Sequence, residues 1–313
     1  MYEPRKLRFV EVDEPQLTAA NQIVFQPELG CLCGSDLPYF DRDYHEFFPQ
    51  VGQSLHEMIG RVVDTNGDRF AAGDRVLCVP VSHFGLCERF AVSQENAIPL
   101  LPGEDEHLLM AQPLGTVICA LRKLPNLMNW NVVVMGQGPM GQIFNAALRM
   151  AGAKQIIAVD PVPERLAVSP RTGATATIQP GEQDVVEAVA DLTGGQMADL
   201  VVEVVGHREQ QVNLCVELCR RAGKLLLFGV PCEKLDDLNI TRLFWKNLTV
   251  HTSVAPDFAI DFPLAMQWIS EGRIDLRPII THRYPLAEIQ AAFDLFRDRR
   301  DGALKVLIDF PRT

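Results

Sequence analysis

The stretch from Asn131 to Asp160 constrains the fold more than any other part of the sequence. Val132–Met135 is a short apolar run of the kind that is buried on both faces of a parallel sheet. A glycine-rich turn follows at once, and apolar residues then recur at helical spacing until Gly152. Ile156–Val159 is predicted to be the next buried strand. We therefore predict a strand, a helix and a strand in this order, as in parallel sheets covered by helices.

The turn has the spacing of a dinucleotide-binding motif. Gly136 permits the tight turn, Gly138 lets a pyrophosphate approach the backbone, and Gly141 lets the helix pack close to the sheet. The helix then begins with Pro139 and Met140, where unpaired N–H groups face the phosphates. The alternative left open by the motif alone is a glycine-rich turn that binds nothing.

Asp160 bears on the choice of cofactor. It ends the second strand, where a carboxylate can accept the hydroxyl groups of the adenosine ribose. The same carboxylate would repel the 2′-phosphate of NADP, and the next residue is Pro161 rather than an arginine. We therefore expect NAD in preference to NADP.

Length and charge bound the class of protein. A chain of 313 residues predicts about two domains. The net charge of −11 argues against nucleic acid as a main partner, because phosphate binding needs clustered Lys and Arg. The sequence begins with no apolar core of signal-peptide length, and no run is long enough to span a membrane. We expect a cytoplasmic protein without a membrane partner, whose eight cysteines are mostly reduced.

The pattern of elements divides the chain into two predicted domains. Residues 1–118 carry short β-type runs separated by turns, and residues 119–254 alternate strands with helices, which predicts a doubly wound parallel sheet. Residues 255–313 are too few for a domain and are expected to pack back on the first. Gly206 and Gly229 each follow a strand of the second domain, where such sheets bind ligands, and are therefore candidate cofactor-binding residues. The strands predicted in the first domain are Leu7–Val12, Gln22–Leu29, Met58–Asp64, Asp74–Pro80 and Arg89–Val92.

A second group of polar residues lies in the β-rich part. Cys33 is on a loop after a predicted strand, and His56 precedes another strand. Thiolate and imidazole suit Zn²⁺, and a catalytic zinc keeps one position open for water or substrate. Asp36 could orient the imidazole through its other nitrogen. One cysteine and one distant histidine are by themselves a weak signal for zinc.

The two groups together resemble the medium-chain dehydrogenase/reductase superfamily, and within it the zinc-dependent alcohol and polyol dehydrogenases of the sorbitol and threonine type. The resemblance covers nearly the whole chain. It implies a mostly-β GroES-like catalytic domain beside a Rossmann nucleotide domain, an α/β fold. The segments that carry it are LGCLCGSDLPYF, HEMIGRV, AAGDRV, QPLGTVICA, VVVMGQGPMGQ and GRIDLRPIITHRYPLAEIQAAF.

The resemblance implies a set of zinc ligands. Cys33 matches the zinc thiolate and His56 the zinc histidine. Glu57 matches a carboxylate beside the metal that is a direct ligand in the polyol enzymes. Gln112 falls where many relatives have a glutamate near the metal. The four-cysteine cluster that holds a structural zinc in many relatives is absent from the sequence, so we expect one catalytic zinc at most.

The resemblance also implies catalytic roles beyond metal binding. Ser35 matches the hydroxyl that hydrogen-bonds the substrate alcohol and passes on its proton, and Asp36 matches the partner of the zinc histidine. Glu57 joins them as a catalytic candidate beside the metal. Pro38 stands where many relatives have a histidine that relays the proton to solvent, and His45 is a candidate substitute.

Two departures from the family pattern keep alternatives open. Leu55 precedes His56, where the family usually has glycine, and Gln112 is neutral where relatives carry a carboxylate. The expected activity is hydride transfer between a secondary alcohol or polyol and NAD. The alternatives are a zinc-free reductase of the same superfamily, or a non-catalytic NAD-binding sensor. Relatives pair the strand matching Leu248–Thr252 across a two-fold axis, so we expect a homodimer or homotetramer acting on a small molecule.

Overall fold

The chain forms two compact units in a computed structural model that describes residues 1–41, 50–206, 209–235 and 237–311. The first unit comprises Met1–Gln112, Phe258–Glu271 and Ile280–Thr313. The second comprises Pro113–Asp257 and Gly272–Ile279. The first unit is therefore assembled from both ends of the chain. No helix in the described part combines the length and apolar character that crossing a bilayer requires.

The first unit is built on a mixed sheet of seven strands among the described residues. Its order is β12-β13-β1-β2-β3-β5, and β4 pairs with β1. The strands are β1 (Gln22–Cys31), β2 (Glu57–Thr65), β3 (Arg75–Cys78), β4 (Phe90–Ser93), β5 (Ala97–Pro99), β12 (Ile280–Pro285) and β13 (Lys305–Asp309). The helices are α1 (Leu37–Asp41), α2 (Asp105–Leu109), α9 (Asp261–Ser270) and α10 (Ile289–Asp298).

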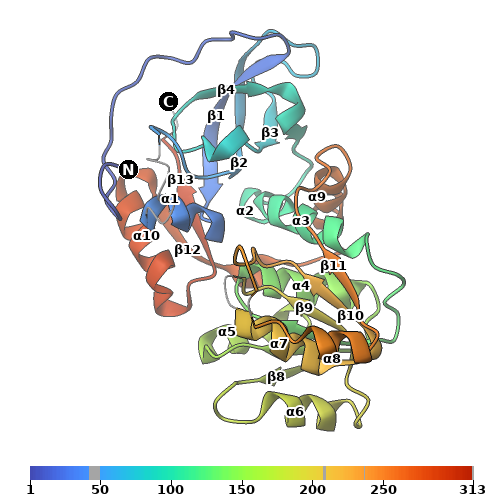
Figure 1. The fold of residues 1–313 in the computed structure, drawn as a ribbon. Coiled ribbons are helices and arrows are strands. Elements are labelled where there is room, and N and C mark those ends of the chain that lie inside the picture. Colours follow the sequence, from blue (N-terminus) through green and yellow to red (C-terminus); the bar gives the residue numbers. More distant parts are fainter. Residues whose placement is uncertain (42–49, 207–208, 236, 312–313) are drawn as a thin grey trace. The chain divides into compact units, whose positions relative to one another are not determined.

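The last strand of the chain completes the sheet beside the first. β13 runs antiparallel to β1, with Cys31 opposite Leu307, and Figure 1 shows the red C-terminal strand next to the blue N-terminal one. On its other side β1 pairs with β2, where Cys31 lies opposite Glu57. The end of β1 therefore has a residue from the start of β2 on one side and β13 on the other.

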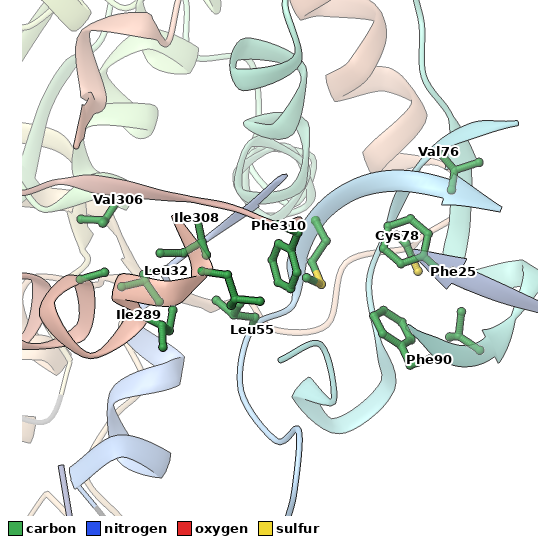
Figure 2. Close-up of a cluster of buried hydrophobic side chains, with 14 of the residues drawn as sticks. Phe25, Leu32, Leu55, Val76, Cys78, Phe90, Ile289, Val306, Ile308 and Phe310 are labelled. Atoms are coloured by element: carbon green, nitrogen blue, oxygen red, sulfur yellow. The ribbon is translucent and has the colours of Figure 1, made fainter. Parts of the chain in front are cut away.

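One apolar core lies within the first unit. The buried strand residues face α10, and Phe40 of α1 stacks on Phe293 of α10 with ring centroids 4.8 Å apart. Figure 2 shows part of this core, with labelled side chains from β1, β3, β4, β13 and α10 and from the residues next to these strands. Its labelled members are Phe25, Leu32, Leu55, Val76, Cys78, Phe90, Ile289, Val306, Ile308 and Phe310.

The predicted strand Leu7–Val12 is wrong. These residues form no strand in the structure, although four of the other predicted strands are present with small shifts at their ends. Phe9 and Val12 are 66% and 61% exposed. Strand propensity depends on pairing with a neighbouring strand, and no described strand pairs with this segment.

The second unit is a parallel sheet in the order β8-β7-β6-β9-β10-β11. If the six described strands of this sheet are numbered 1 to 6 in chain order, their order in the sheet is 3-2-1-4-5-6. This is the order of dinucleotide-binding doubly wound sheets, whose ligand crevice lies between strands 1 and 4. The predicted α/β class and doubly wound sheet are confirmed. The strands are β6 (Asn131–Met135), β7 (Gln155–Val159), β8 (Ala176–Ile178), β9 (Ala198–Glu203), β10 (Cys219–Leu227) and β11 (Thr249–Thr252).

Helices connect these strands, and a separate apolar core lies within the unit. The helix that begins at Glu209 ends at Leu218, because the next residues already belong to β10. The helices are α3 (Ala111–Leu121), which begins in the first unit, α4 (Pro139–Met150), α5 (Pro163–Val168), α6 (Val185–Leu192), α7 (Glu209–Leu218) and α8 (Ile240–Trp245).

Candidate functional site

Three potential metal ligands meet at one end of the first unit's sheet. One ligand atom each from Cys33, His56 and Glu57 lies within 4.8 Å of the others. The pairing of β1 with β2 explains this meeting. Cys31 lies opposite Glu57, so Cys33, just beyond the end of β1, is brought beside His56, just before β2. The structure thus brings together three of the four predicted zinc ligands.

The buried carboxylate of Asp36 holds the two ligand-bearing segments in place. Its Oδ2 accepts a hydrogen bond from the Cys33 amide at 2.8 Å. Its Oδ1 accepts one from the Leu55 amide at 2.7 Å and one from the Ser54 hydroxyl at 3.1 Å. Because Asp36 is 0% exposed, water does not compete for these bonds. One side chain therefore fixes the residue before His56 relative to Cys33.

His56 carries a polar atom without a hydrogen bond. Its Nδ1 is buried and has no hydrogen-bond partner among the described residues, and it lies 3.9 Å from Asp36 Oδ1. That distance is too long for a hydrogen bond but close enough for charge attraction. Burial alone would lower the pKa of His56, but Asp36 and Cys33 outweigh it and raise the pKa well above 6.5. A thiolate, an imidazole and a carboxylate so arranged fit Zn²⁺.

Leu55 adopts a backbone conformation that usually belongs to glycine. Its φ is +63°, in the left-handed region, where a β-carbon is crowded. This explains why the family's pattern has glycine at the position before the zinc histidine. The side chain is fully buried in the apolar core, and Figure 2 shows it with Leu32, Ile289 and Phe310. Packing of the leucine and the Asp36 hydrogen bond hold the strained residue in place.

Lys305 is the residue that sequence reasoning missed. Its Nζ lies 2.6 Å from Oε1 and 2.5 Å from Oε2 of Glu57, and both side chains are 1% exposed. Burial would lower the pKa of Lys305, but the Glu57 carboxylate outweighs it and keeps the lysine charged. The available sequence signal was a lysine directly before the apolar run VLI of the last predicted strand.

A second imidazole lies against the first. The rings of His83 and His56 are 4.3 Å apart between centroids in an edge-to-face arrangement. The backbone holds His83 there, because the Ser54 amide donates to its carbonyl at 2.6 Å. Tyr39, next to Pro38, contacts the His83 ring with its hydroxyl 3.5 Å from Nδ1. Burial and the charge of His56 lower the pKa of His83.

The remaining predicted residues of this site are placed as follows. Ser35 is exposed on the short turn Gly34–Asp36 that follows Cys33. Gln112 is buried near the start of α3, and its part in a metal site stays a prediction. His45, the suggested relay residue, lies outside the described residues.

The predicted nucleotide-binding turn joins β6 to α4. Gly136 has φ +99°, and a β-carbon there would lie 2.9 Å from Val205. A β-carbon on Gly141 would lie 1.9 Å from the Gly136 carbonyl oxygen, so helix and turn are in direct contact. At Gly138 the nearest atom to an added β-carbon is 3.8 Å away, on Arg165, which leaves space over the backbone. Pro139 and Met140 open α4. The three glycines thus meet the three predicted steric demands.

Asp160 organises this turn as well as ending β7. Its Oδ2 accepts a hydrogen bond from the Gln137 amide at 2.7 Å, and its Oδ1 accepts one from Val162 at 2.8 Å. Arg165 Nη1 lies 3.7 Å from Oδ2. The carboxylate is 3% exposed. The carboxylate therefore has a structural role that the sequence did not indicate, and its role toward the ribose stays a prediction.

Gly206 and Gly229 meet at the carboxyl ends of β9 and β10. A β-carbon on Gly229 would lie 2.3 Å from the Gly206 nitrogen, so the two loops touch backbone to backbone. Glu203, buried at the end of β9, contacts both loops: its carboxylate accepts from the amides of Val205 and Gly206 at 2.7 and 2.9 Å, and its backbone carbonyl accepts from the Gly229 amide at 3.0 Å. Since β9 neighbours β6, these loops border the predicted ligand crevice.

Comparisons with known proteins show that this chain is similar to dehydrogenases. The family model of zinc-binding dehydrogenases matches residues 139–271. The erythritol/L-threitol dehydrogenase of Mycolicibacterium smegmatis is 26% identical over 97% of this chain and 95% of its own length. The sorbitol dehydrogenase of Bacillus subtilis is 23% identical over 98% of this chain and 95% of its own.

Solved structures have the same fold over almost the whole chain. An alcohol dehydrogenase from Thermus sp. ATN1 superposes with a TM-score of 0.89 at 23% identity, covering 99% of both chains. The galactitol-1-phosphate dehydrogenase of Escherichia coli gives 0.86 at 22%, covering 96% of both. These likenesses confirm the GroES-like and Rossmann architecture. Over nearly its whole length the chain is thus similar to polyol dehydrogenases, and its central part matches the zinc-binding dehydrogenase family.

Proposed function

We propose that this protein is an NAD-dependent alcohol or polyol dehydrogenase with one catalytic zinc. The observation that carries the proposal is the meeting of Cys33, His56 and Glu57, fixed by Asp36, in a chain with a dinucleotide-binding turn. The named relatives act on small alcohols with several hydroxyl groups, such as erythritol and sorbitol. A secondary alcohol or polyol, or the corresponding ketone, is therefore the proposed substrate class.

The residues of the first unit would hold the metal and manage the alcohol proton. Cys33 and His56 are the proposed ligands, with Glu57 and Gln112 as further candidates. A zinc ion held there would act as a Lewis acid on the substrate oxygen. Asp36, whose carboxylate lies 3.9 Å from His56 Nδ1, would orient the imidazole, and the exposed hydroxyl of Ser35 would accept the proton of the alcohol.

The residues of the second unit would hold NAD. The turn at Gly136, Gly138 and Gly141 and the N-terminus of α4, with Pro139 and Met140, would bind the pyrophosphate. Asp160 would bind the ribose hydroxyls and disfavour NADP. Gly206 and Gly229 would line the cofactor where their loops approach without side chains. When bound there, the nicotinamide would supply the acceptor for the hydride of the alcohol carbon.

The decisive experiment replaces the thiolate. In Cys33→Ser we expect turnover and bound zinc to be lost while NAD still binds, because the nucleotide site lies in the other unit. Zinc per chain is measured by elemental analysis and NAD binding by calorimetry. Cys87→Ser removes another partly buried cysteine of the same unit and should leave both unchanged. Full activity in Cys33→Ser would refute the zinc role.

One observation favours a zinc-free reductase as the second candidate. The Glu57 carboxylate is already neutralised by Lys305, as a site without metal would require. Such an enzyme would reduce an activated double bond or quinone with no need for Cys33. Protein that contains no metal and takes up none when Zn²⁺ is added would favour this candidate.

We also propose a homodimer or homotetramer whose chains meet at the edge strand β11. Support comes from exposed apolar residues: Val254 is 86% exposed, and Phe244 and Trp245 are each 68% exposed. An unpaired edge strand needs covering, and β11 has a partner on one side only in the described sheet. Light scattering at micromolar concentration tests this, and a monomer would contradict it.

The proposed domains are residues 1–118 with 255–313 for catalysis and 119–254 for NAD. The compact units support the division, because they change over after Gln112 and after Asp257, a few residues from the proposed bounds. They differ in one segment, Gly272–Ile279, which belongs to the second unit. We further propose a cytoplasmic location. All eight cysteines are unpaired, as expected in a reducing compartment.

A further inference from the structure

The buried ion pair between Lys305 and Glu57 lies directly beside the candidate metal ligands. β13 pairs with β1 in a register that sets Leu307 opposite Cys31 and Ile308 opposite Gly30. Continued past the end of β1, this register sets Lys305 opposite Cys33, and the Leu32 amide indeed donates to the Val306 carbonyl at 3.0 Å. The strand pairing therefore delivers a fixed positive charge to the ligand cluster.

The carboxylate of Glu57 lies beside both Lys305 and the other two candidate metal ligands, so it can interact with either the ammonium group or a metal ion. Both oxygens lie within hydrogen-bond distance of Lys305 Nζ, and one of them also belongs to the cluster with Cys33 and His56. Neither charge of the pair can turn to solvent, since both side chains are 1% exposed. A metal ion that binds Glu57 must therefore share its oxygens with the ammonium group or displace it.

We propose that Lys305 competes with the metal ion for the Glu57 carboxylate, weakening metal binding and keeping Glu57 from closing the coordination shell. A catalytic site needs one position left open for the substrate oxygen, and an engaged Glu57 leaves it open. This inference rests on the proposed function, because it concerns the same site. It makes Lys305 a positioning residue that acts through Glu57.

If Lys305 competes with zinc, removing it should change the zinc affinity in the opposite direction from removing a residue that orients a metal ligand. Partners that orient a metal ligand strengthen binding, and their loss weakens metal affinity about 10–100-fold. If Lys305 competes, its loss must instead tighten zinc binding. The direction of the change therefore separates the two roles.

The test is the zinc dissociation constant of the full chain, measured by competition with a chelating indicator. We expect Lys305→Met to bind zinc at least about tenfold more tightly than the wild type, and Lys305→Arg, which keeps the charge, to stay near the wild type. Lys246→Met is the matched control. Lys246 is also largely buried, but it donates to backbone carbonyls at the end of α7 in the second unit.

The substitution Lys305→Met made in a Glu57→Gln variant shows whether Lys305 affects zinc binding through Glu57. In Glu57→Gln the carboxylate is absent, so adding Lys305→Met should give little further tightening. This double variant also buries no unpaired charge. Should Lys305→Met fail to fold without metal, Lys305→Gln replaces it, because an amide can still donate to Glu57 without carrying charge.

Each outcome is decisive. Tighter zinc binding that disappears in the Glu57→Gln background supports the inference. Unchanged or weaker binding overturns it, as does tightening that persists in full without Glu57. If the wild type binds zinc and Cys33→Ser does not, the proposed function stands whatever Lys305 does. If only Lys305→Met binds zinc, the inference stands and the native enzyme works without the metal. If neither binds zinc, both fail.

Discussion

At the scale of single residues, Leu55 shows how a departure from a family pattern is accommodated. The left-handed backbone at φ +63° costs a non-glycine residue roughly 1–3 kcal/mol. Burial of the leucine side chain offsets this, because removing such a side chain from a core costs about 2–5 kcal/mol. The packing term is the larger, so the leucine is retained with its strain.

This balance predicts that the usual order of stability of an alanine and a glycine variant is reversed at position 55. Leu55→Ala and Leu55→Gly should both destabilise the protein, but the glycine variant should be at least as stable as the alanine variant, since only alanine keeps the strain. Leu77, buried in β3 with ordinary strand geometry, is the control, and there glycine should be worse by about 0.5–1 kcal/mol. Urea unfolding measures all four. An alanine variant clearly more stable than glycine at position 55 contradicts the strain.

The candidate site could be predicted only where its residues are close in sequence. Cys33, Ser35 and Asp36 lie on one loop, and His56 lies beside Glu57, so their spacing carried the prediction. Lys305 reaches the same place through the register of β13 on β1. Strand pairing between distant segments leaves no local signal in a single sequence.

At the scale of elements, the turn between β6 and α4 separates the needs of folding from the needs of binding. A β-carbon on Gly141 would collide with the Gly136 carbonyl at 1.9 Å, whereas one on Gly138 meets only Arg165 at 3.8 Å. Gly141 therefore serves the packing of helix on turn, and Gly138 serves the approach of a ligand.

The two glycines predict two different failures. Gly141→Ala should destabilise the second unit by roughly 1–3 kcal/mol, in the range of overpacked sites, and so weaken NAD binding indirectly. Gly138→Ala should leave stability nearly unchanged but weaken NAD binding, because the methyl group occupies the space over the backbone. Thermal unfolding without ligand and calorimetric titration with NAD separate the effects. Equal losses of stability in both variants would show that this division is wrong.

Strands could be predicted from the sequence where an apolar run also has neighbouring strands to pair with in the fold. β6 and β7 are buried on both faces and have partners on both sides, and their bounds were predicted closely. Leu7–Val12 has the same β-type composition but no strand to pair with. Helix α7 ends at Leu218 because Cys219–Arg221 belong to strand β10 of the sheet. Tertiary pairing decided both exceptions.

At the scale of the whole molecule, the two units carry separate cores and separate candidate sites. We therefore expect two unfolding transitions in calorimetry after metal removal. Zinc should raise one and NAD the other, each by about 2.7 kcal/mol of stability at a ligand concentration 100 times its dissociation constant. Gly138→Ala should abolish the NAD shift and leave the zinc shift. A single transition raised equally by both ligands would contradict this independence.

The position of β13 also has a consequence for synthesis. β1 lies between β2 and a strand that is made about 270 residues later, so this side of β1 stays unpaired while the intervening chain is translated. At about 5–20 residues per second, this lasts roughly a quarter of a minute to a minute. During that interval the acidic group of Glu57 has no lysine beside it. Until β13 emerges and pairs, the open side of β1 exposes unpaired backbone groups that another chain could bind.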